Sequence, residues 1–118
     1  MRDLIVAVAL LGATAAPAAA FIPHQGHYVG KDRSGRSVDF VFVDHHVKRW
    51  TLDGRIGVPD AYVSTSTNSF RKVFYHHDLE GTWTNANHVK GTYAYYRQTS
   101  RGMVRVTIDW TAHRKVGS

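Results

Sequence analysis

The segment LEGTWTNANHVKGTYAYY, residues 79–96, decides the fold, because it holds two alternating runs around a short polar turn. Apolar residues and glycines recur at every second position in both runs: Leu79, Gly81, Trp83, Val89, Gly91, Tyr93 and Tyr95. A period of two places them on one face of a β-strand. The Asn-Ala-Asn turn at 85–87 joins the runs, and asparagine is a typical turn residue. The segment therefore predicts a β-hairpin with an aromatic face.

The same alternation recurs along the rest of the chain. The last run is the clearest: Val104, Val106, Ile108, Trp110 and Ala112 share one face, and Met103, Arg105, Thr107, Asp109 and Thr111 share the other. Glycine-bearing turns separate the runs, for example at 32–35 and 53–54. We expect about eight strands, over residues 26–30, 36–43, 46–52, 55–58, 69–76, 79–85, 88–96 and 103–113. Residues 59–68 read as a long loop.

The predicted fold class is all-β, an antiparallel up-and-down meander that closes, or nearly closes, into a small β-barrel. Closure is favoured because it removes exposed edge strands. The chain has no cysteine, so packing has to stabilise it without disulfides. Three Trp, five Phe and six Tyr supply the large apolar side chains for that interior.

Residues 1–20, MRDLIVAVALLGATAAPAAA, have the anatomy of a secretory signal peptide. Arg2 gives a weak basic start, an apolar run follows over 4–16, and small residues precede the expected cleavage after Ala20. The run is too short to cross a bilayer of ~30 Å. We expect a signal peptide over 1–20 and a single barrel-like domain over 21–118. That domain is expected to be secreted or periplasmic, and not membrane-spanning once cleaved.

The net charge of +6 favours an anionic partner, such as an envelope polymer bearing phosphate, an acidic glycan or an anionic lipid. Solubility alone also explains a charge of this size, and export argues against nucleic acid as the natural partner. Cations beside aromatic rings give the candidate ligand-binding residues: Arg49, Trp50, Arg71, Tyr95 and Arg97. The alternative is that Trp50 and Tyr95 fill the core while the arginines remain in solvent.

Two clusters of histidine and aspartate are candidate metal ligands: Asp44, His45 and His46, and His76, His77 and Asp78. Imidazole and carboxylate together suit Zn²⁺ or Cu²⁺. The clusters converge only if both lie at one rim of the barrel. Adjacent residues on a strand point to opposite faces, so each histidine pair offers one ligand per face.

Signals for catalysis are poor, since the chain has no cysteine nucleophile, no Gly-x-Ser-x-Gly, no P-loop and no dinucleotide fingerprint. Glu80 and Asp109 are the acids inside strong strand patterns, both on polar faces, and no catalytic residue is assigned. The leading hypothesis is a non-enzymatic binding module, without a cofactor, for an anionic envelope component or a small ligand. The alternatives are a metal-binding protein and a small hydrolase. The oligomeric state is not indicated.

The stretches GTWTNANHVKGTY (81–93) and GHYVG (26–30) resemble the strand-turn-strand pattern of small secreted bacterial β-barrels, including the lipocalin-like and avidin-like calycins. The resemblance implies the architecture alone. Avidin-like chains space their Gly-Thr-aromatic signatures more widely, and their polar pocket residues have no counterpart here. The glycines before Tyr28, Trp83 and Tyr93 are expected to leave room for a neighbouring ring or to let the strand bend.

Overall fold

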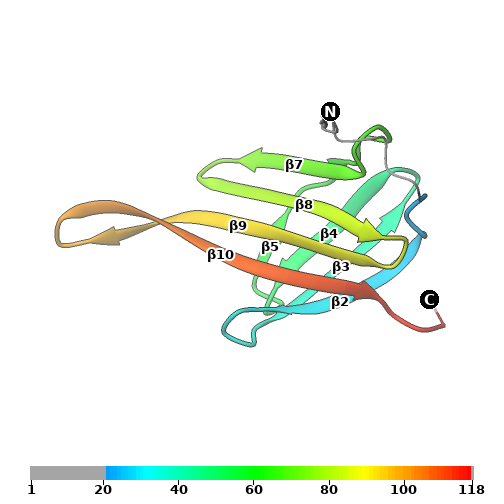
Figure 1. Cartoon of the computed structure of the whole chain (residues 1–118). Coiled ribbons are helices and arrows are strands. Elements are labelled where there is room, and N and C mark those ends of the chain that lie inside the picture. Colours follow the sequence, from blue (N-terminus) through cyan, green and yellow to red (C-terminus); the bar gives the residue numbers. More distant parts are fainter. Residues whose placement is uncertain (1–20, 118) are drawn as a thin grey trace, which may run out of the picture.

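A computed structural model describes residues 21–117, and these residues form one antiparallel sheet that curls into a nearly closed barrel (Figure 1). The predicted all-β meander is thereby confirmed. This part of the chain contains no helix, and hence none able to cross a membrane. The predicted signal peptide, residues 1–20, lies outside the described residues.

The strands follow one another along the chain with short turns. Their bounds are β2 (Gly26–Asp32), β3 (Ser37–Val43), β4 (His46–Leu52), β5 (Ile56–Val58), β6 (Ala61–Tyr62), β7 (Ser69–Phe74), β8 (His77–Asn85), β9 (His88–Thr99) and β10 (Gly102–Arg114).

The sheet order is β5-β4-β3-β2-β10-β9-β8-β7, with β6 beside β4. Two meanders, one from each half of the chain, are joined where β2 pairs antiparallel with β10. The remaining seam lies between β7 and the segment that carries β5 and β6. Backbone pairing closes this seam at one point, where the Ser64 amide donates to the Ser69 carbonyl over 2.9 Å.

The structure corrects several predicted strand bounds. β2 and β9 run further than expected, to Asp32 and Thr99, and β8 begins earlier, at His77. The strand expected over 69–76 ends at Phe74, and Tyr75 and His76 form the turn to β8. The loop expected over 59–68 contains β6 and buries Ala61, Val63 and Asn68. These buried side chains cover the core beside the seam. Their burial comes from tertiary contacts, which the local sequence does not reveal.

Aromatic side chains fill the barrel interior. The largest fully buried ones are Trp50, Trp110, Tyr28, Tyr93 and Phe40. The polar group of Tyr28 is satisfied, because its hydroxyl accepts a hydrogen bond from Trp83 Nε1 at 3.1 Å and donates to the carbonyl of His24 at 2.6 Å. The predicted aromatic interior is therefore a packed core.

Two glycines make room for Trp110. Gly81, Gly91 and Trp110 lie side by side on β8, β9 and β10. A Cβ atom at Gly91 would lie 2.6 Å from the Trp110 ring and 2.0 Å from the Glu80 carbonyl oxygen. The indole lies across the space that both glycines leave and packs against Phe70, with 6.4 Å between ring centroids. Two of the predicted Gly-x-aromatic glycines thus accommodate a neighbouring ring.

A β-bulge directs Trp50 into the core. The β3–β4 register shifts between Asp39 and Val41, so that Arg49 and Trp50 lie opposite Phe40 alone. Arg49 takes a left-handed conformation, with φ at 55°. Val47 and Trp50 are three positions apart, so a regular strand would place them on opposite faces. The extra residue of the bulge turns Trp50 inward, and both side chains are buried. Bulges commonly re-aim a side chain in this way.

Substituting Gly91 by alanine tests the packing of Trp110 against the two glycines. We expect Gly91→Ala to lower the free energy of unfolding by about 1–3 kcal/mol, because the new methyl group collides with backbone and with the indole. Gly57→Ala is the matched control, since a Cβ there meets nothing within 4 Å. It should change stability by no more than about 0.5 kcal/mol. Urea denaturation measures both, and equal effects would contradict the packing argument.

Candidate functional site

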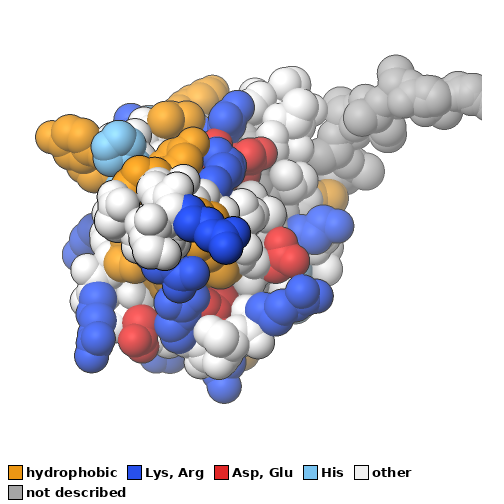
Figure 2. All heavy atoms as spheres, turned by 90° about the vertical axis from the view of Figure 1, so that its left-hand side faces the viewer, with side chains coloured by type: hydrophobic (Ala, Val, Ile, Leu, Met, Phe, Trp, Pro, Cys, Tyr) orange, Lys and Arg blue, Asp and Glu red, His pale blue; other side chains and the backbone are white. Residues whose placement is uncertain are grey.

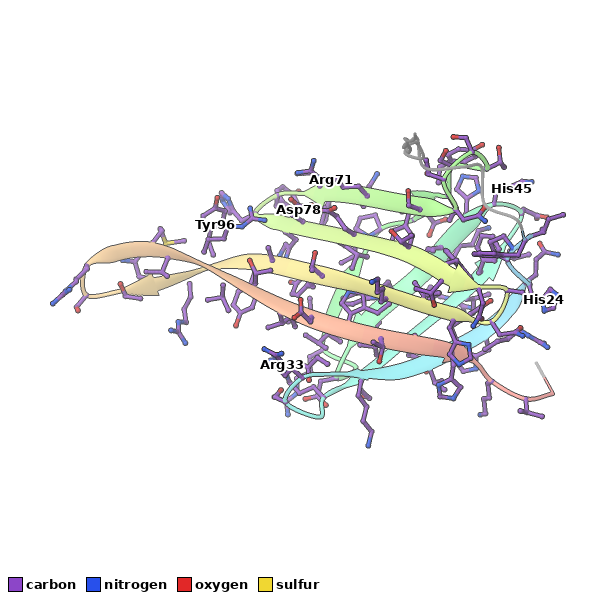
Figure 3. The ribbon with its side chains drawn as sticks, viewed as in Figure 1. His24, Arg33, His45, Arg71, Asp78 and Tyr96 are labelled. Carbon is purple, nitrogen blue, oxygen red and sulfur yellow. The ribbon has the colours of Figure 1, made fainter. Side chains whose placement is uncertain are left out.

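The two ends of the barrel differ in chemistry. We call one the hairpin end; it carries the turns at 33–36, 53–55, 75–76 and 100–101. The opposite one, the histidine end, carries the turns at 44–45 and 86–87 together with residues 21–25. Figure 3 shows His24 and His45 at the histidine end and Arg71, Asp78 and Tyr96 toward the hairpin end.

The two clusters of candidate metal ligands lie at opposite ends. Asp44 and His45 form the β3–β4 turn and His46 begins β4, all at the histidine end, whereas His77 begins β8 at the hairpin end. Asn85 lies eight positions beyond His77 on β8, which is ~25 Å of extended chain. The clusters therefore do not converge. In residues 21–117 no group of three or more His, Cys, Asp or Glu side chains could hold a metal ion.

Six of the eight histidines occupy the histidine end: His24, His27, His45, His46, His88 and His113. Several have polar partners; His27 Nε2, for example, lies 2.7 Å from Asp39 Oδ1. A half-open pocket of about 910 Å³ lies at this end, lined among others by Phe21, His24, Asp44 and His45. This volume falls in the range of small-ligand pockets.

The hairpin end exposes apolar side chains. The β9–β10 hairpin projects beyond the rest of the barrel (Figure 1). Of the eight large apolar side chains exposed in residues 21–117, five lie on this hairpin or on β7 and its turn: Val73 (60 %), Tyr75 (84 %), Tyr96 (43 %), Met103 (55 %) and Val104 (43 %). We call these five residues the apolar tips. Val104 occupies the core face of β10, as predicted, but it is exposed because the hairpin continues past the core.

Cations surround the apolar tips. Figure 2 looks onto this end and shows Lys and Arg side chains spread between the apolar ones, with few acids. The basic residues on the hairpin end are Arg33, Arg36, Arg55, Arg71, Lys72, Arg97, Arg101 and Arg105. Within residues 21–117, Arg33, Arg55, Lys72, Arg97 and Arg101 form no ion pair, so their charges are available to a partner.

Two buried carboxylates at this end are already neutralised. Asp78 accepts hydrogen bonds from Arg71 Nε at 3.1 Å and Nη2 at 2.9 Å, and Arg105 Nη2 lies 3.5 Å from it. The hydrogen bonds from Arg71 lower the pKa of Asp78, against the opposing effect of burial. Burial likewise opposes ionisation of Asp32, but hydrogen bonds from Ser34 and Arg36 outweigh it and lower its pKa. The two carboxylates hold the arginines in place and leave the end with a surplus of positive charge.

An aromatic stack leads from the core to the hairpin end. The rings of Phe74, His77, Tyr93 and Tyr95 stack in succession across β7, β8 and β9. His77 Nδ1 forms a hydrogen bond with the Tyr93 hydroxyl. Burial, with a contribution from Tyr95, raises the pKa of Tyr93 to about 12, so its phenol stays neutral at physiological pH. The stack gives the base of the hairpin a rigid attachment to the barrel.

The structure separates the predicted ligand-binding residues. Arg71, Tyr95 and Arg97 all lie toward the hairpin end, on β7 and β9, but Arg71 is on the outer face of the sheet, whereas the other two fall on the inner face by alternation. Trp50 has no exposed surface and belongs to the core. Arg49 is exposed in the middle of β4, where its conformation serves the bulge.

The sequence analysis missed Tyr75, Tyr96, Arg101, Met103 and Arg105 as site residues. Tyr75 was expected inside a strand over 69–76, so its place in a two-residue turn, a position that prefers glycine or asparagine, became visible only in the structure. The other four could be recognised only from the length of the β9–β10 hairpin, which the alternation pattern understates.

Glu80 and Asp109 share the outer face of the sheet on either side of Thr92. A shallow groove of about 500 Å³ lies over this row, and both acids and Lys90 contribute to its lining. No histidine is among its described lining residues. The two carboxylates thus occupy the polar face that the alternation predicted.

The Asp78 cluster predicts a dependence of stability on pH. The pKa of Asp78 is lower in the folded chain, so its contribution is fully present above about pH 4, the ordinary aspartate range, and is lost as the pH falls through the folded value. We expect Asp78→Asn to destabilise the fold at pH 7 by about 1 kcal/mol, a modest value because both arginines are partly exposed. The difference from the parent chain should shrink toward pH 2.

Chemical denaturation at a series of pH values measures this effect. Asp53→Asn is the matched control, because it removes the same charge from an exposed turn where no ion pair occurs among residues 21–117. An Asp78→Asn chain that follows the pH profile of Asp53→Asn would show that the arginine pairing contributes nothing.

Comparison of the chain with protein-family models, with curated proteins and with solved structures gives no match.

Proposed function

We propose that the protein is an exported binding module that holds an anionic envelope component on the outer surface of its hairpin end. The observation that carries this proposal is the concentration of unpaired cations and exposed apolar side chains on one projecting end. The architecture, shared with small secreted β-barrels in general terms, and the sequence pattern of residues 1–20 support the exported location.

The filled interior favours surface binding over enclosure of a ligand. Calycin-like barrels that carry small molecules keep a cavity among their strands. Here Trp50, Tyr93 and Trp110 occupy that space and have almost no exposed surface. A partner of this barrel therefore meets its exterior.

Charge supports an anionic partner at this end. Arg36, Arg71 and Arg105 are held by buried carboxylates, while Arg97 and Arg101 extend from the hairpin without an ion pair in the described part of the chain. A surface that gathers positive charge in this way raises the local concentration of anions and steers their approach.

Two double variants, each of which neutralises two cations, test the proposal. With sodium polyphosphate as the probe, we expect Arg97→Gln/Arg101→Gln to weaken binding about tenfold at low salt, because two unpaired cations are lost. Binding of the parent chain should also weaken steeply as salt rises. Isothermal titration calorimetry at several salt concentrations measures both effects.

The matched control is Lys48→Gln/Lys90→Gln, which removes the same charge from β4 and β9 nearer the histidine end. It should retain most of the affinity. Equal losses in both double variants would show that net charge alone attracts the polyanion, and the assignment of the hairpin end would be wrong.

A second candidate function is binding of a small ligand in the pocket at the histidine end. The supporting observation is that Phe21, His24, Asp44 and His45 line one space of suitable size. Metal binding by Asp44, His45 and His46 remains a prediction from the residue types.

A further inference from the structure

We infer that the anionic partner is a lipid bilayer, on which the apolar tips enter the headgroup region while the surrounding cations pair with lipid phosphates. This inference rests on the proposed function and names its partner. The residues that carry it are the apolar tips, from β7 and from the β9–β10 hairpin (Figure 3 labels Tyr96 among them).

Both faces of the projecting hairpin carry exposed apolar side chains. Met103 and Val104 are neighbours on β10, so they point to opposite faces, and about half of each is exposed. A flat, rigid surface contacts one face of a hairpin at a time. A fluid interface surrounds it, and therefore removes both side chains from water together.

Tyr75 is a bulky aromatic in a position that disfavours one. Its φ is 52°, the left-handed region that favours glycine, and its side chain is 84 % exposed. The fold gains little from this side chain, whose described ring contact is with Phe74 at 4.5 Å between centroids. A strained and exposed tyrosine at a turn is therefore better explained by an external contact. Tyrosine favours the membrane interface, because its ring is apolar and its hydroxyl is polar.

The apolar tips on the outer face form a connected surface. Tyr96 contacts His76 edge-on, with 6.0 Å between ring centroids, which links the hairpin to the turn that holds Tyr75. Tyr96 lies directly opposite Arg105, and Met103 lies diagonally across from it. Diagonal neighbours are within reach of long side chains. The two turns therefore present their apolar side chains to the same partner.

The cations are placed to reach phosphates around this surface. Arg97 pairs in register with Val104, and Arg101 occupies the hairpin turn itself. Long arginine side chains can extend to the headgroups while their neighbours enter the apolar layer. A soluble polyanion satisfies the cations but leaves the apolar tips in water, whereas an anionic bilayer takes up both.

Vesicle sedimentation of the exported protein, purified after the expected cleavage that follows Ala20, tests the inference. The probe is a set of phosphatidylcholine vesicles with and without about one quarter of phosphatidylglycerol. We expect the chain to bind the anionic vesicles. We expect Tyr75→Ser/Met103→Ser to lower the partition coefficient at least tenfold and to leave polyphosphate binding within about twofold, because no charge is lost.

The matched control is Tyr62→Ser/Val116→Ser, which removes two equally exposed apolar side chains outside the hairpin end. It should bind vesicles as the parent chain does. Tyr75→Gly separates binding from folding: it relieves the left-handed strain, so its thermal midpoint should equal or exceed that of the parent while its vesicle binding falls. A Met103→Trp reporter should shift its emission to shorter wavelength on anionic vesicles.

The outcomes separate this inference from the proposed function. Vesicle binding that persists in Tyr75→Ser/Met103→Ser would overturn the inference, since another segment would then be responsible. Polyphosphate binding without vesicle binding would also overturn it and leave the proposed function standing. A dimer that forms through Tyr75 and Met103, seen by analytical ultracentrifugation, would assign the apolar tips to a second copy of the chain. Absence of binding to either probe would remove both proposals.

Discussion

The contact between Trp110 and two glycines is the constraint on which the barrel depends. Gly81 and Gly91 leave a strip without side chains, and the indole lies across it to reach Phe70 on the far side of β8. One large ring thereby links β10 to β7 across the two strands between them, β9 and β8. Trp50 and Phe40 pack against the same indole from the other half of the chain. Without cysteine, this shared ring does the joining that disulfides perform in many small exported domains.

The sequence was sufficient to predict the fold class and most strands, because burial on one face imposes a period of two. The pattern over 79–96 is typical: Leu79, Trp83 and Tyr93 are all buried, as their spacing predicts. Prediction failed where tertiary contacts override local preference. The two residues of β6 pair with β4 and lack a pattern long enough to recognise. Arg49 breaks the alternation through a bulge that only the partner strand explains.

The candidate site was only partly predictable, for a different reason. Arg71, Tyr95 and Arg97 were identifiable as cations and rings close in sequence, and they do share one end of the barrel. The exposure of Met103 and Val104 depends on how far β9 and β10 extend past the neighbouring strands β8 and β2, which the local pattern does not reveal. The same limit applies to the histidines. Two similar His-His pairs suggest one site, but an odd number of strand crossings places His45 and His77 at opposite ends.

The seam beside β7 gives this barrel a place to open. Pairing with β8 secures one side of β7, while on its other side one isolated bridge joins Ser69 to Ser64, in the segment that follows β6. A fully closed barrel must break a complete ladder before any strand can leave, but here the edge strand can peel away with far fewer bonds lost. Amide protons of β7 should therefore exchange with solvent sooner than those of β9. Since β7 also carries Arg71 and Val73, any partner that contacted these side chains would also hold this edge strand against the barrel.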